Sequence, residues 1–85
     1  MKVYTVMKEN NDHFDGYHLM EKCGCFTSEE RAIETAKAVF EEVKTEMMKD
    51  YTKYTIEEDV TYHAFSTVNM SVIVFVDDWE LNEEE

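Results

Sequence analysis

The strongest constraint on the fold is one long segment, residues 28–49, whose apolar side chains recur at steps of three and four residues. This spacing places them on one side of an α-helix about 33 Å long. The other side carries glutamate and lysine at i,i+3 spacing, which suits a solvated helix surface. Thr27 and Glu30 have the spacing of a capping box, so we predict that the helix begins beside them. The apolar positions are Ala32, Ile33, Ala36, Val39, Phe40, Val43 and Met47.

Before this helix the pattern is a two-residue alternation, which predicts β-strands. Residues 3–8 are rich in β-formers, and residues 17–23 alternate in the same way. Between them, residues 9–16 contain Asn, Asp and Gly, which tolerate the backbone angles of turns. We therefore expect a hairpin with a long loop.

After the helix the alternation returns. Residues 54–63 alternate apolar and polar side chains, and residues 66–69 form a plausible turn. Residues 70–76 are apolar on both faces except at Ser71, which is typical of a strand inside a sheet. The prediction is an α+β fold of order β-β-α-β-β: a four-stranded, mostly antiparallel sheet with one long helix packed on one face.

A chain of 85 residues has room for one modest core. We predict one domain over residues 1–81, followed by a flexible acidic tail at residues 82–85. The sequence has no apolar run near the ~20 residues of a membrane span. The start, MKVYTV, lacks the apolar core of a signal peptide. We expect a cytoplasmic protein of a bacterial host cell that does not contact membranes.

One helix cannot cover both faces of such a sheet, so one apolar face needs another explanation. It is exposed as an interaction site, paired in a homodimer, or covered by sheet twist and long side chains. The strand at residues 70–76 leaves the choice of face open. The face turned to the helix is either that of Val72, Val74 and Val76 or that of Ile73, Phe75 and Trp79.

Cys23 and Cys25 flank Gly24 in the segment CGCFTSEE. A thiolate pair can bind zinc with two further Cys or His ligands, but the remaining candidates are three scattered histidines: His13, His18 and His63. In a strand, a C-x-C pair lies on one face, which suits two small apolar residues beside a bend or bulge. We predict a structural role, with no metal and no cofactor.

Sequence signatures of catalysis are missing. The chain has no nucleophile elbow and no local Cys/His signature. It has two glycines, Gly16 and Gly24, and no glycine-rich phosphate loop. It also lacks a basic stripe for nucleic acid. We expect a protein that is not an enzyme, has no catalytic residues and does not bind nucleic acid directly.

The formal net charge of −12 is distributed unevenly. Residues 50–85 hold ten acidic residues and one basic residue, Lys53, for a net charge of −9. Such a field attracts basic surfaces and speeds encounter with them. The expected partner is the basic surface of a nucleic-acid-binding protein or nuclease complex.

A turn at residues 66–69 would bring two acidic groups together on neighbouring strands. Their carboxylates, about 6.8 Å apart along a strand and about 4.8 Å across strands, have spacings of the same order as DNA phosphates. Trp79 supplies an aromatic anchor. The alternative is a solvated strand face with an acidic tail. The predicted contact residues are Glu57, Glu58, Asp59, Asp77, Asp78, Trp79 and Glu80.

Two resemblances follow from these features. A short acidic chain rich in Lys, Glu, Asn, Tyr and Met resembles small proteins of phages and mobile elements, among them anti-CRISPR and anti-restriction proteins that mimic nucleic acid. This resemblance implies an inhibitor of a host CRISPR effector or restriction complex, which would occupy the basic nucleic-acid-binding surface of that complex.

The second resemblance is local. YTVMKENNDHFDGY and GCFTSEERAIETAKAVFEEV, within residues 4–43, are similar to the HicB-like antitoxin domain. This implies a sheet, one helix and neutralisation of an RNA-cleaving toxin. The alternative function is therefore a HicB-like antitoxin, or a homodimeric interaction scaffold that uses the apolar sheet face.

Overall fold

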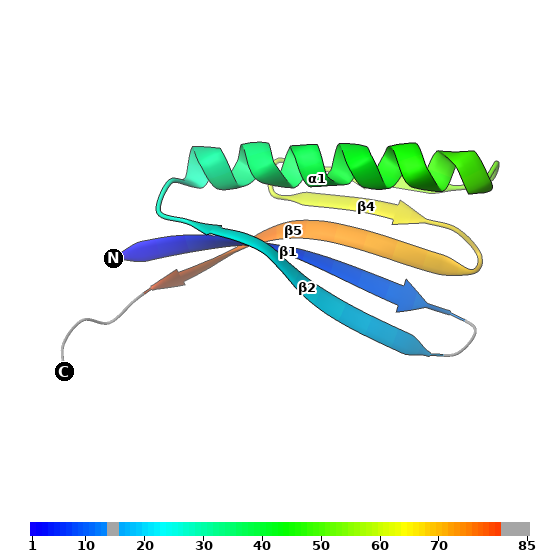
Figure 1. Ribbon diagram of the computed structural model, residues 1–85, viewed down its shortest axis with the longest axis horizontal. Helices are drawn as coiled ribbons and strands as arrows, with labels where there is room; N and C mark the ends of the chain where they lie inside the picture. Colours follow the sequence, from blue (N-terminus) through cyan, green and yellow to red (C-terminus); the bar gives the residue numbers. More distant parts are fainter. Residues whose placement is uncertain (14–15, 81–85) are drawn as a thin grey trace.

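A computed structural model describes residues 1–13 and 16–80. This part of the chain forms an antiparallel sheet of five strands, with one α-helix along one face (Figure 1). The strand order across the sheet is β2-β1-β5-β4-β3. The elements are β1 (Lys2–Asp12), β2 (Tyr17–Phe26), α1 (Glu29–Asp50), β3 (Thr55–Glu58), β4 (Tyr62–Ser66) and β5 (Met70–Glu80).

The α+β class and the single long helix are confirmed, but the strand count is not. The segment at residues 54–63 forms two strands, β3 and β4, instead of one. The chain reverses at Asp59, whose carboxylate accepts a hydrogen bond from Val60 N–H at 2.8 Å. The Asp59 N–H donates to the Tyr62 carbonyl at 2.7 Å. Aspartate favours such a turn because its short side chain bonds the nearby backbone. β4 therefore lies between β3 and β5.

The β1–β2 hairpin is longer than predicted. Residues 9–12 belong to β1, although they were expected in a loop. They pair with β2 on one side and with β5 on the other. Pairing on both edges overrides the weak strand preference of Asn and Asp. The backbone of His13 then bonds Asn69 at 2.8 Å, which ties this end of the hairpin to the β4–β5 turn.

The helix begins at a different cap from the one predicted. Ser28 is the N-cap, and its Oγ accepts a hydrogen bond from Arg31 N–H at 3.3 Å. The capping box of Thr27 and Glu30 is wrong, because the cap lies one residue later and Arg31 occupies the position that the box reserves for glutamate. Glu29 and Glu30 still complement the positive end of the helix dipole.

The core lies between α1 and the helix-facing side of the sheet. The small Ala32 and Ala36 leave room for the sheet to approach α1, while Phe40 and Val43 fill the space further along the helix. The buried core residues are Val6, Ala32, Ala36, Phe40, Val43, Phe65, Val72 and Val74. Of the two alternatives for β5, the structure therefore selects Val72, Val74 and Val76 as the helix-facing set.

The described residues account for most of the predicted single domain. Leu81 and the predicted tail at residues 82–85 lie outside them. Within the described residues, no helix is both long enough and apolar enough to cross a membrane.

Candidate functional site

The side of the sheet opposite α1 is the first candidate site, and we call it the open face. The described chain has one helix, α1, which lies along one face of the sheet (Figure 1), and no second helix or sheet lies against the opposite face. Because side chains alternate along a strand, the neighbours of the helix-facing valines point to this side. The open-face stripe comprises its main apolar residues: Met7, Tyr62, Ile73, Phe75 and Trp79.

Strand register brings this stripe together. Phe75 pairs with Met7 on one side and with Tyr62 on the other, so three strands contribute to one row. Such neighbours are about 4.8 Å apart across the sheet. Tyr62 is 41% exposed and Trp79 is 56% exposed, while Phe75 is half-buried. A contiguous apolar surface with exposed aromatic rings is typical of an interaction site.

The predicted acidic residues divide between the two faces. Glu57 pairs with Ala64, and Asp77 lies between Phe75 and Trp79, so both belong to the open face. Glu58 lies on the helix-facing side, where its carboxylate is 3.2 Å from His63 Nδ1 and 3.6 Å from Lys44 Nζ.

The remaining predicted acidic residues, Asp59, Asp78 and Glu80, also have partners within the chain. Asp78 is 3.3 Å from Lys2 Nζ, and Glu80 is 3.7 Å from the amino terminus. Asp59 is occupied in the β3–β4 turn. The prediction that the two acidic groups lie on neighbouring strands is wrong, because β4 separates β3 from β5. One strand of the sheet therefore separates the two acidic segments.

Nearby carboxylates raise the pKa values of two lysines, Lys2 and Lys44. The pKa of Lys2 is raised above its usual value, chiefly by the hydrogen bond to Asp78. The pKa of Lys44 is also raised, first by its hydrogen bond to Glu41 and then by the charge of Glu58. Both effects favour the charged ammonium.

Cys23 and Cys25 do not share a face, although their spacing predicted that they would. A bulge interrupts the register of β2 opposite Val6 and Met7, and Cys23 is the residue without a direct partner. Cys23 packs against the core, while Cys25 pairs with Thr5 and is exposed. Burial raises the pKa of the Cys23 thiol, and the nearby Glu21 charge adds to this effect.

The cysteines and histidines do not converge. Within residues 1–13 and 16–80, no group of three or more His, Cys, Asp or Glu residues is placed to hold a metal ion. His13 lies at the β4–β5 turn, where its Nδ1 is 3.1 Å from the Val68 carbonyl. His18 lies on β2, 3.3 Å from Glu9. His63 is on β4, 2% exposed and stacked on Phe40 at 5.3 Å.

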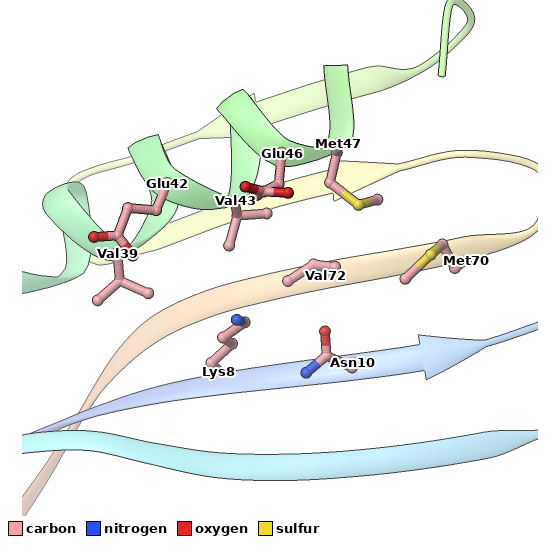
Figure 2. A pocket seen from close by; sticks show the side chains of 9 residues that line it. All are labelled: Lys8, Asn10, Val39, Glu42, Val43, Glu46, Met47, Met70 and Val72. Atoms are coloured by element: carbon pink, nitrogen blue, oxygen red, sulfur yellow. The ribbon is translucent and has the colours of Figure 1, made fainter. Parts of the chain in front are cut away.

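A groove lies on the helix-facing side of the sheet, between α1 and the strands β1 and β5. This groove has a volume of about 210 Å³. Figure 2 shows helix side chains on one wall and side chains of β1 and β5 on the other. Sequence reasoning missed the groove because it arises from sheet curvature. Its lining residues are Lys8, Asn10, Val39, Glu42, Val43, Glu46, Met47, Met70 and Val72.

The groove and the open face differ in what they can bind. The groove has charges of both signs at its margin, Lys8 against Glu42 and Glu46. The open face is broad and combines aromatic rings with carboxylates, which suits a protein surface.

No family model, no curated protein and no solved structure matches this chain. The fold and the open face therefore define a class in structural terms: a small acidic α+β domain with one helix-covered face and one uncovered, aromatic face.

Proposed function

We propose that the protein is a non-enzymatic acidic binding protein that inhibits a host nucleic-acid-processing complex, of the CRISPR effector or restriction type, by occupying its basic nucleic-acid-binding surface. The observation that carries this proposal is the net charge of −12, of which −9 belongs to residues 50–85. A field of this sign repels nucleic acid and attracts the lysine- and arginine-rich surfaces that bind it.

The acidic side chains remain accessible to such a partner. The ion pair of Lys2 with Asp78 is exposed, and exposed ion pairs contribute little to stability. A basic partner can therefore replace Lys2 at little cost. Glu57, Asp77 and Trp79 share the open face, so charge and an aromatic anchor are available to one partner surface.

Charge reversal tests this proposal. The double variant Glu57→Lys with Asp77→Lys changes the net charge by the same amount as Glu34→Lys with Asp50→Lys on α1. The measurement is inhibition of DNA cleavage by a panel of purified CRISPR effector and restriction complexes at several salt concentrations. We expect the inhibition to weaken steeply with salt and to be lost in the open-face variant, while the helix variant retains most of it.

If both double variants inhibit equally well, the surface that contacts the partner does not depend on Glu57 and Asp77. The absence of inhibition or binding by the wild-type protein across the panel would contradict the proposed function.

A second candidate function is a HicB-like antitoxin or a homodimeric scaffold, and the uncovered apolar stripe favours it. Two copies would have to bring charges of −12 together, which opposes a face-to-face dimer at low salt. Light scattering distinguishes the possibilities, because a dimer has twice the mass of the 10.1 kDa chain. A dimer that disappears in Phe75→Asp would favour the scaffold.

A further inference from the structure

The open face arranges rings and carboxylates in an order that charge alone does not explain. Along β5, the residues that point to this face are Ile73, Phe75, Asp77 and Trp79. Successive members are about 6.6–6.8 Å apart. Tyr62 lies beside Phe75 on the neighbouring strand. A carboxylate thus lies between two aromatic rings, with a third ring alongside.

The rings on the two faces of the sheet differ in whether they stack on another ring. On the helix-facing side, Phe40 stacks on His63 at 5.3 Å, and Tyr54 stacks on Phe65 at 4.8 Å. These contacts belong to the packing between α1 and the sheet or to the sheet edge.

Tyr62 and Trp79, in contrast, expose 41% and 56% of their surface. Among the described residues, no stacked ring pair includes either of them. Their faces are free to stack on a partner.

We propose that the open face imitates a single-stranded nucleic acid, so that its target is the groove in which a protein binds single-stranded DNA or RNA. Such grooves combine cationic side chains, which follow the phosphates, with aromatic side chains on which bases stack. The complementary surface must offer flat rings and negative charges side by side, as Phe75, Asp77 and Trp79 do.

A duplex presents a different surface. Its bases are stacked inside, and the general contacts that proteins make with it go mainly to phosphates. An imitation of duplex DNA therefore needs carboxylates and has little use for exposed rings. Two exposed aromatic residues in an apolar stripe favour the single-stranded target over the duplex target.

The inference rests on the proposed function and narrows its target. Asp77 and Glu57 supply the charge complementarity to the cationic groove. Lys22 is the opposing charge on this side, on β2 across from Met7. It lies at the sheet margin, one strand beyond the β1 side of the stripe, so the acidic residues dominate next to the rings.

Displacement from immobilised DNA tests the inference. Bacterial extract is loaded on single-stranded DNA resin and on duplex DNA resin, and the protein is then added in increasing amounts. We expect release of proteins from the single-stranded resin at lower concentrations than from the duplex resin. A released protein is identified, purified and assayed with a fluorescent oligonucleotide and with the matching duplex.

The decisive variants change the rings and leave the charge intact. Tyr62→Ala with Trp79→Ala removes two exposed rings, and we expect it to compete on the order of ten-fold less well or worse, as for loss of base stacking. Trp79→Phe keeps a ring and should retain most of the competition. Val68→Ala with Met48→Ala removes exposed apolar side chains elsewhere and should compete like the wild-type protein. Thermal unfolding by circular dichroism checks that each variant is folded.

The outcomes separate the two proposals. Release from the duplex resin at equal or lower concentrations, or undiminished competition by Tyr62→Ala with Trp79→Ala, would overturn the single-stranded target and leave the inhibitor function standing. If the protein releases nothing from either resin, the single-stranded target is overturned, and the panel of cleavage assays decides separately whether the inhibitor function stands. Selective release that depends on the rings would support both.

Discussion

The two faces of β5 are made of similar residues but differ in how much of their surface is exposed to solvent. Val72 and Val74 are 3% and 0% exposed, because α1 covers them. Ile73 and Phe75, one residue further along, remain half-buried on the open face, where no described element covers them. The comparison shows that apolar character by itself does not assign a residue to the core. On β5, packing of α1 against one face decides which residues are fully buried, and this packing is set by the tertiary structure.

The difference also separates stability from function. On the covered face, each side chain lowers the free energy of the folded state by leaving water and packing closely. On the open face, the same kind of side chain stays partly in water and gains less free energy from folding. Variants on the two faces should therefore affect different measurements.

The largest effect is expected for a covered aromatic residue. Phe40→Ala removes a fully buried ring between α1 and the sheet, and it should lower the free energy of unfolding by about 3–5 kcal/mol. Tyr62→Ala on the open face should cost about 1 kcal/mol or less, because the side chain is 41% exposed. Urea denaturation monitored by circular dichroism measures both. If the two variants are equally destabilised, the open face is covered in solution.

The next effect concerns the start of α1, which holds the covering element in place. Ser28→Ala removes the bond to Arg31 N–H and should cost about 1 kcal/mol. Thr27→Ala is the matched control, because Thr27 lies outside the cap and its loss should cost less than about 0.5 kcal/mol. A larger loss for Thr27→Ala would mean that the capping box forms after all. Thermal unfolding resolves the difference.

The alkylation rates of the two cysteines compare a thiol that packs against the core with one that is exposed. Cys25 is exposed, while Cys23 is half-buried with a raised thiol pKa. Because the thiolate is the reactive form, iodoacetamide at pH 8 should alkylate Cys25 several-fold faster than Cys23. Mass spectrometry of single variants, Cys23→Ser and Cys25→Ser, gives each rate. Equal rates in the folded protein would indicate that the β2 bulge opens readily.

The smallest effect is expected at Lys44, which bridges α1 and β3 at the edge of the covered face. Its raised pKa means that its ion pairs stabilise the fold fully below the unfolded value near 10.5. This contribution is lost as the pH rises through the folded pKa. Wild type should exceed Lys44→Met in stability by a few tenths of a kcal/mol at pH 8, since the pairs are partly exposed. The gap should close as the pH rises through the folded pKa of Lys44, and a gap that stays constant with pH would assign the effect to packing.

Much of the fold could be predicted from sequence, and the failures have identifiable causes. The helix was predictable because its three- and four-residue spacing admits one interpretation. The division of residues 54–63 was not, because a strand that continues and a strand that turns at Asp59 show the same alternation. The extension of β1 to Asp12 depended on partners on both sides, which local propensity does not contain.

The candidate site was predictable in part. The need for one uncovered apolar face followed from a single helix and a strand that is apolar on both sides. Trp79 and Asp77 do lie on that face. The two acidic segments do not lie on neighbouring strands, because β4 lies between β3 and β5. The role of these residues in partner binding stays a prediction.

The sequence alone determined the helix stripe, the alternating strands and the strongly negative charge, because each depends on residue type and spacing along the chain. Only the tertiary structure decided which side of β5 the helix covers, that β4 separates the acidic segments, and that a bulge turns Cys23 and Cys25 to different sides. These features depend on which segments meet, and pairing between distant strands is fixed by the combined packing of the whole sheet.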